Sequence, residues 1–275
     1  LVHVIAVRGI ISPATDALIK REIKHATEQK ADLLILEMDT PGGLYESTQQ
    51  IAQSILDSSV PVATFVYPSG GHAASAGTYI LYASPIAAMA PATNLGAATP
   101  IQMSPSGEKK EGEEKQQRPS STLENKIVND ASAFIRGLAE RHGRNAEWAE
   151  RAVREAESLT ASEALSKKVI DVIADDSAAL ADKLEGRVVI MSKDAKKTLS
   201  TKGAEIVRIE PGLRHDLLEI ITHPNVALLL MSLGTYGLIY EFANPGALFP
   251  GIIGAICLLL GLYAMNILPV SYSAL

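Results

Sequence analysis

The chain has 275 residues, of which 47% are hydrophobic and 20% charged, and its formal net charge at pH 7 is −6. Such an apolar chain is not mainly disordered, and an acidic chain without a long basic run is a poor candidate for binding the phosphate backbone of nucleic acid. The single cysteine, Cys257, excludes an intramolecular disulfide and a cysteine-based zinc site.

The first hundred residues alternate short apolar runs with helical patterns. The apolar runs predict strands at residues 2–7, 33–38, 60–67 and 86–90. Helices are predicted between them, from Ser12-Pro13 to about Gln29, around Ile51 to Leu56, and over about 72–83. This alternation favours a mostly parallel sheet in an α/β domain, and the unbroken apolar run at 33–38 is typical of a strand covered on both faces.

A polar segment follows at residues 103–122, which from Ser104 onward contains no aliphatic or aromatic residue. It has nothing to bury, so we expect a mobile surface loop. Beyond it the patterns predict helices at 123–142 and 146–156 and a short helix and a strand within 159–173, followed by a Val/Ile-rich tail at 188–191 and 206–209. These complete an expected domain of residues 1–210.

Charge almost disappears in the last part of the chain, where Glu241 is the only Asp, Glu, Lys or Arg in the 56 residues after Glu219. We therefore expect a juxtamembrane segment at 211–223 and a membrane region at 224–275, with helices near 226–243 and 248–268. A helix of about 20 apolar residues crosses a hydrocarbon core of about 30 Å. The alternative is a buried hairpin of a soluble protein, which the lack of a polar face disfavours.

The two ends of the sequence also suggest a fragment. Leu1 opens directly into a strand-like run, which a removed signal peptide or a trimmed start would explain. Leu275 ends an uncharged stretch, so we expect the membrane region to be truncated.

Ser75 is the first candidate for chemistry, because it lies among glycine and alanine where a strand is expected to turn into a helix. Small neighbours let a substrate backbone approach the hydroxyl, and free amides at a helix start suit a developing oxyanion. The competing interpretation is that the small residues only allow tight helix packing. Gly42 and Gly43 follow the strand at 33–38, at the end where open α/β sheets bind ligands, although the glycines alone favour an ordinary Pro-Gly-Gly turn.

A nucleophilic serine needs a base. His72 is three residues from Ser75, but a helix start disfavours imidazolium, and the next histidine, His142, ends a distant helix. A lysine can serve instead if desolvation favours its neutral form, and Lys126 lies at the edge of an apolar helix stripe. The competing interpretation is a solvated surface lysine. No sequence motif for a metal or phosphate site is present.

Three motifs together resemble the NfeD-like membrane serine proteases, also called stomatin-operon partner proteins, of the ClpP/crotonase superfamily. They are Asp39-Thr40-Pro41-Gly42-Gly43, Ala73-Ala74-Ser75-Ala76-Gly77, and Lys126-Ile127-Val128-Asn129-Asp130 followed by Gly143-Arg144-Asn145. The resemblance implies a spiral of β-β-α units, followed here by a transmembrane helical hairpin. It also implies a Ser-Lys dyad in which Ser75 is the nucleophile and Lys126 the general base.

Further site residues and partners also follow from the resemblance. The amides of Gly43 and Ala76 are the expected oxyanion hole, and Gly42, Gly71 and His72 the expected substrate-binding residues. Expected partners are a hydrophobic peptide or membrane-protein substrate, a stomatin-like protein, the membrane, and further copies of the chain as a dimer or higher oligomer. Two departures stand out, since His72 replaces an expected basic residue such as arginine and the 103–122 segment is unusually long and charged.

The sequence therefore predicts a membrane-anchored serine endopeptidase that needs neither cofactor nor metal. We expect a multi-pass membrane protein with its catalytic domain on the extracytoplasmic side. Two alternatives stay open at this point. One is a crotonase-type acyl-CoA enzyme that holds a thioester enolate on the amides of Gly43 and Ala76. The other is a non-catalytic membrane scaffold for stomatin-like proteins.

Overall fold

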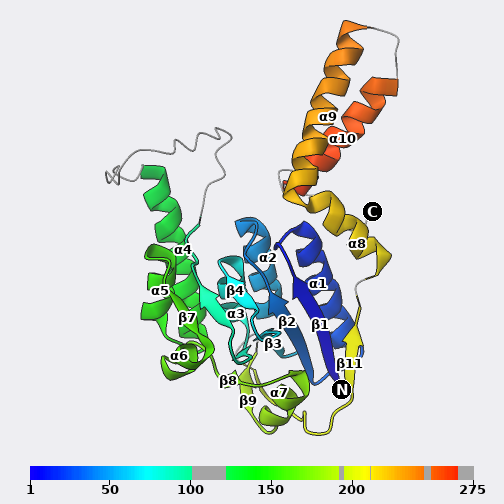
Figure 1. Ribbon diagram of the computed structural model, residues 1–275. Helices are drawn as coiled ribbons and strands as arrows, with labels where there is room; N and C mark the ends of the chain where they lie inside the picture. Colours follow the sequence, from blue (N-terminus) through cyan, green and yellow to red (C-terminus); the bar gives the residue numbers. More distant parts are fainter. Residues whose placement is uncertain (101–121, 192–194, 211, 245–248, 266–275) are drawn as a thin grey trace.

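A six-stranded parallel sheet forms the centre of the first part of the chain (Figure 1). The computed structural model describes residues 1–100, 122–191, 195–210, 212–244 and 249–265. The strand order is β11-β1-β2-β3-β5-β8, and every neighbouring pair is parallel, as predicted. The strands are β1 (Val2–Arg8), β2 (Leu33–Asp39), β3 (Val62–Val66), β5 (Ile86–Met89), β8 (Val172–Ile173) and β11 (Ile206–Ile209).

Apolar clusters cover both faces of this sheet. Alternate residues of β2 divide between them, because Leu34 and Leu36 join one cluster and Leu33 and Ile35 the other. This explains the unbroken apolar run of the strand. The first cluster packs against α1 (Pro13–Glu28), α2 (Tyr45–Leu56), α3 (Ala76–Ala83), α4 (Thr122–Arg141), α5 (Ala146–Arg154) and α6 (Ala161–Ser166). The second packs against α7 (Ser177–Lys183) and the antiparallel pair β9 (Val188–Ile190) and β10 (Lys196–Thr198).

A smaller sheet of order β4-β6-β7 corrects the predicted helix at 72–83. Its strands are β4 (His72–Ala74), β6 (Asn94–Gly96) and β7 (Ser158–Thr160). Thr40 donates its amide to the His72 carbonyl at 2.8 Å and accepts the Ala74 amide at 3.0 Å, while β6 pairs with the other edge of β4. These distant partners hold His72–Ala74 extended, so the helix begins only at Ala76.

Other predicted boundaries shift for similar reasons. The strand expected around Val169 and Ile170 lies at Val172–Ile173, where it pairs with β5. Strands β6 and β10 and helix α7 were not predicted, because each is short and takes its place from a neighbour in space. The predicted start of α1 is confirmed, since Ser12 caps the helix and Pro13 is its first residue. The segment predicted as a mobile loop, 103–122, lies outside the described residues except for Thr122, which begins α4.

Three helices follow β11, namely α8 (Leu213–Thr222), α9 (Pro224–Ala243) and α10 (Phe249–Ala264). Helices α9 and α10 pack side by side as a hairpin that stands away from the sheet (Figure 1). Their backbones approach closely, because a Cβ added to Gly234 would lie 2.7 Å from the Leu258 nitrogen. The segment Asn225–Ala243, with mean hydropathy 1.5, is long and apolar enough to cross a membrane, whereas α10 is apolar but shorter.

Candidate active site

Ser75 occupies a sharp turn between β4 and α3. Its backbone has φ 49° and ψ −109°, a conformation that costs a non-glycine residue about 1–3 kcal/mol. Although Ser75 stands at the N-cap position of α3, its hydroxyl accepts no capping hydrogen bond. The strained turn therefore presents a half-buried hydroxyl that the helix start does not use.

The fold holds this turn through the side chain of Thr78. The Ser75 amide donates to the Gly96 carbonyl of β6 at 2.9 Å. Thr78 Oγ1 accepts the Gly96 amide at 3.0 Å and lies 2.8 Å from the Ala73 carbonyl oxygen. The small residues also serve packing, since a Cβ on Gly77 would lie 2.7 Å from Thr40 Cγ2. The packing interpretation of the small residues therefore holds for Gly77.

The other end of α3 is held by Arg144, which is 7% exposed. Its Nη1 donates to the carbonyl oxygens of Tyr82 and Ser84 at 3.2 and 2.8 Å, and its Nη2 pairs with Asp171 at 2.7 Å. Burial alone would raise the pKa of Asp171, but Arg144, the Ala87 amide and Arg187 together hold that pKa below its ordinary value. The arginine of the Gly143-Arg144-Asn145 motif thus caps the helix that begins at Ser75.

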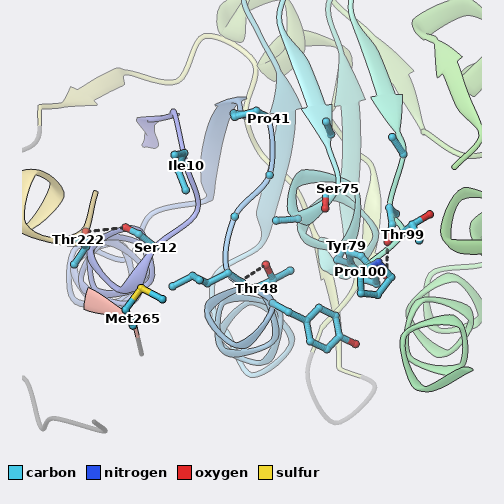
Figure 2. Close-up of a pocket in the computed structure, with 18 of the residues that line it drawn as sticks. Ile10, Ser12, Pro41, Thr48, Ser75, Tyr79, Thr99, Pro100, Thr222 and Met265 are labelled. Atoms are coloured by element: carbon cyan, nitrogen blue, oxygen red, sulfur yellow. Dashed lines mark hydrogen bonds between the residues drawn. The ribbon is translucent and has the colours of Figure 1, made fainter. Parts of the chain in front are cut away.

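The Ser75 hydroxyl points into a cavity of about 590 Å³ (Figure 2). Four chain segments of the α/β domain line it, together with three residues from α8 and the end of α10. None of the described residues that line it carries a charge. The lining residues are Ile10, Ser12, Pro41, Gly42, Gly43, Leu44, Tyr45, Thr48, Ala74, Ser75, Ala76, Tyr79, Ala97, Ala98, Thr99, Pro100, Thr222, Ala264 and Met265.

Two backbone amides of the lining have no acceptor. Neither Gly43 nor Ala76 donates its N–H to any group in the described part of the chain. The Ala76 amide also lies at the positive end of α3. Gly42, which precedes one of these donors, has φ 122°, and a Cβ on it would lie 2.9 Å from Ser75 Cβ. The structure therefore brings together Ser75, Gly42, Gly43 and Ala76.

Lys126 is exposed in the second turn of α4 and is not among the residues that line the cavity. The face of α4 that carries Lys126 nevertheless contacts the cavity wall further along the helix. Residues 126, 130 and 134 lie on one face of a helix, and the ring of Phe134 stacks on that of Tyr79, with 6.0 Å between centroids. Burial, followed by the charge of nearby Asp130, raises the pKa of Tyr45 to about 12. Lys126 lies one turn beyond Asp130, or about 6 Å along the helix axis.

The histidines are accounted for by other partners. His72 Nδ1 lies 3.2 Å from Asp39 Oδ1, and the His72 amide donates to the same oxygen at 3.1 Å. Gly71 also packs against Asp39, and neither Gly71 nor His72 lines the cavity. His142 lies at the far end of α3, with Nε2 3.1 Å from the Ala83 carbonyl oxygen. Burial, followed by the Arg144 charge, lowers the pKa of His142 to about 4.

Sequence reasoning missed the aromatic part of the cavity and its membrane-side wall. Tyr45 and Tyr79 meet edge to face, with 5.8 Å between ring centroids, and the Tyr79 hydroxyl donates to the Ala98 carbonyl at 2.9 Å. Tyr79 follows Ser75 by four residues, so helical spacing was the available signal for it. Nothing in the sequence pattern indicated that Thr222 and Met265 would lie in the same cavity.

Comparison with known proteins places these features in a family. A family model described as the NfeD1b N-terminal domain matches residues 1–209, and one for the NfeD integral membrane domain matches residues 225–275. The membrane-bound protease PH1510 of Pyrococcus horikoshii is 38% identical over 263 residues, which are 95% of this chain and 57% of that protein. The membrane protein NfeD1b of Bacillus subtilis is 27% identical over 262 residues, or 95% of this chain and 55% of that protein. The chain thus spans little more than half the length of these relatives.

Solved structures of the 1510-N membrane-bound stomatin-specific protease share the fold. A lysine-to-alanine mutant in complex with a substrate peptide has a TM-score of 0.70 at 36% identity, covering 80% of this chain and 97% of that one. A serine-to-alanine mutant has a TM-score of 0.68 at 36% identity, covering 77% of this chain and 98% of that one. The ClpP/crotonase-like fold expected from the sequence is thereby confirmed, and the integral membrane domain makes this a membrane protein. With the N-terminal domain model matching more than half of its length, the chain belongs to the NfeD family.

Proposed function

We propose that this chain is a membrane-anchored serine endopeptidase that uses Ser75 as nucleophile and Lys126 as general base. One observation carries the proposal. The strained turn directs an uncapped hydroxyl into an uncharged cavity beside the unpartnered amides of Gly43 and Ala76. A nucleophile and oxyanion donors in one water-poor cavity are the combination that acyl transfer requires.

The reaction proceeds through an acyl-enzyme. The neutral Lys126 amine takes the Ser75 proton as Oγ attacks the peptide carbonyl carbon, and the oxyanion formed accepts hydrogen bonds from the amides of Gly43 and Ala76. Collapse breaks the C–N bond, and the lysine ammonium returns its proton to the leaving amine. A water molecule, deprotonated by the same lysine, then hydrolyses the ester and restores the Ser75 hydroxyl.

Lys126 has to reach the cavity from the rim. The face of α4 that carries it packs through Phe134 on Tyr79 of the cavity wall, which supports an approach from that side. An uncharged lining favours the neutral amine once the side chain enters. The relatives support the same pair, because the structures of the stomatin-specific protease include a serine-to-alanine and a lysine-to-alanine mutant.

The apolar lining and the membrane hairpin extend the proposal to the substrate. An uncharged cavity with two tyrosine rings favours a hydrophobic peptide segment, and its position beside α8 and α10 favours a membrane-associated protein as its source. A stomatin-like protein is the proposed partner, by analogy with the relative described as stomatin-specific. We further propose that Gly42, Gly71 and His72 contact the substrate. Copies of the chain are proposed to assemble into a dimer or higher oligomer. The protein is also proposed to cross the membrane more than once, with its catalytic domain on the extracytoplasmic side.

Cleavage of a hydrophobic peptide pool, followed by mass spectrometry, tests the dyad. Ser75→Ala and Lys126→Ala should each abolish the products that the wild-type protein forms. Lys24→Ala, which removes an exposed lysine on α1, is the matched control and should cleave like wild type. Retained cleavage by Ser75→Ala would refute the nucleophile, and retained cleavage by Lys126→Ala would refute the base. An uncut pool with the wild-type protein would contradict the protease and favour the scaffold or acyl-CoA alternatives, which binding of coenzyme A separates.

A further inference from the structure

The cavity that contains Ser75 has one wall built by the membrane part of the chain. Thr222, the last residue of α8, and Ala264 and Met265, at the end of α10, line the same cavity as Ser75. In Figure 2, Thr222 and Met265 lie on the left of the cavity beside Ser12, and Ser75 lies on the right with Tyr79, Thr99 and Pro100. The α/β domain therefore supplies the Ser75 side, and α8 and the end of α10 contribute to the opposite side.

Hydrogen bonding and close packing hold this wall in place. The Thr222 hydroxyl lies 3.2 Å from Ser12 Oγ, the N-cap of α1, and Thr222 is 4% exposed. Ala264 is 2% exposed. One turn earlier in α10, a Cβ on Gly261 would lie 2.6 Å from Met231 Cγ, so α10 is pressed against the start of α9. The wall is therefore a packed part of the cavity rather than a passing contact.

The wall also lies close to the apolar surface of the hairpin. Leu228, six residues after Thr222, and Leu259, six residues before Met265, are both 58% exposed. At 1.5 Å per residue Leu259 is about 9 Å along α10 from Met265. An extended peptide covers that distance in about three residues. A substrate segment that leaves the bilayer beside α10 therefore reaches the Met265 side of the cavity with few intervening residues.

We propose that Thr222, Ala264 and Met265 form a substrate subsite on the membrane side of Ser75. The subsite takes an apolar side chain of the substrate, at a position between the scissile bond and the membrane-embedded segment. Its surface is small and apolar apart from one hydroxyl, and a flexible methionine adapts to several side-chain shapes. This inference rests on the proposed protease function and adds that the membrane domain itself selects the substrate.

Substitutions of opposite size test the subsite in the full chain reconstituted in liposomes. The probes are synthetic apolar peptides that carry a 20-residue leucine-rich anchor and vary at one position on either side of the cleaved bond. Ala264→Phe should raise KM about tenfold for large residues on the anchor side, because lost fit in an apolar pocket changes discrimination by about 10–200-fold. Met265→Ala should shift the preference on that side toward larger residues, with kcat changed little in both variants. Ile253→Phe, at a 57% exposed side chain of α10 twelve residues before Met265, is the matched control and should leave KM and preference unchanged.

The outcomes separate this inference from the proposed function. Unchanged KM and unchanged anchor-side preference in Ala264→Phe and Met265→Ala would overturn the subsite. A change in preference confined to the far side of the cleaved bond would overturn it too. In either case, loss of cleavage in Ser75→Ala would still support the protease. An inactive wild-type protein would refute both. Met265→Leu, a milder change with similar volume, keeps the test decisive if a larger substitution prevents folding, because it must still alter the anchor-side preference.

Discussion

The two halves of the proposed dyad sit in different kinds of structure. Ser75 lies at the end of a buried strand, its amide bonded to β6 and its helix capped at the far end by Arg144. Lys126 lies near the start of α4, where residues 122 to 126 are all exposed. A nucleophile must be held within a fraction of an ångström, so it belongs in the sheet. A base on a long side chain tolerates a looser support, in keeping with the proposal that Lys126 reaches the cavity from solvent.

This difference predicts that the free energy of unfolding depends strongly on the contacts that hold α3 behind Ser75 and hardly at all on the first turn of α4. Arg144→Met removes the cap of α3 and leaves Asp171 with one arginine fewer, so we expect a loss of about 3 kcal/mol in the free energy of unfolding. Leu123→Ala, at a side chain 54% exposed, should cost less than about 0.5 kcal/mol. Urea unfolding of both variants in detergent measures their free energies of unfolding. An Arg144→Met protein whose free energy of unfolding lies within about 1 kcal/mol of wild type, the net worth of about one hydrogen bond, would contradict the predicted contrast.

Two glycines sharpen the comparison through activity. Gly42→Ala forces a left-handed backbone angle on alanine and pushes a methyl group against Ser75, so kcat/KM should fall about 10²- to 10³-fold. Gly137→Ala, inside α4 with nothing within 4 Å of the new methyl group, should keep full activity and gain about 0.5–1 kcal/mol of stability. Peptide cleavage and thermal unfolding measure both. An active Gly42→Ala enzyme would mean that the Ser75 turn is not held as tightly as its contacts indicate.

The smallest effect comes from His142, which joins the two halves by donating from just beyond α4 to the end of α3. Its pKa is about 4 when folded against an ordinary value of 6.5, so the unfolded chain binds more protons between these values. Stability from this group is therefore present above pH 6.5 and is lost as pH falls toward 4, by about 2 kcal/mol between pH 7 and pH 4.5. His142→Gln should remove this contribution. The difference in unfolding free energy between wild type and variant, measured at pH 7 and again at pH 4.5, should therefore change between the two pH values. An equal difference at both pH values would show that His142 titrates normally in the fold.

Sequence patterns were sufficient for the fold because its main signals are local and strong. Unbroken apolar runs predicted the strands of the parallel sheet, and Ser12-Pro13 marked the start of α1. The helix predicted over 72–74 was wrong, because the extended shape of β4 comes from backbone pairing with Thr40 and β6 rather than from its own residues. Pairing between segments far apart in sequence leaves little trace in either one.

The candidate site divides in the same way. Ser75, Gly42, Gly43 and Ala76 meet in one cavity because Thr40, just after β2, pairs with Ala73 of β4. The sequence indicated only that Gly42 and Gly43 lie at the ligand-binding end of their strand. Gly71 and His72 were expected to bind substrate from the resemblance alone, and the structure places both against Asp39 and outside the cavity lining. The roles of the site residues, including Lys126, stay predictions. The wall from α8 and α10 required the folded arrangement of segments almost 200 residues apart.

The edge strand β11 gives the membrane anchor a mechanical footing. It runs parallel to β1 from Ile206 to Ile209, and Arg208 reaches across to Glu37 of β2 with nitrogen–oxygen distances of 2.9 and 3.0 Å. A pull on the hairpin reaches the domain along this strand. Because β11 is parallel to β1, this force acts along the strands. It stretches several hydrogen bonds and the ion pair of the buried Glu37 carboxylate at the same time, instead of breaking them one after another. A load from the bilayer or from a bulky substrate therefore enters the sheet at its edge, with three strands, β1, β2 and β3, between β11 and β5.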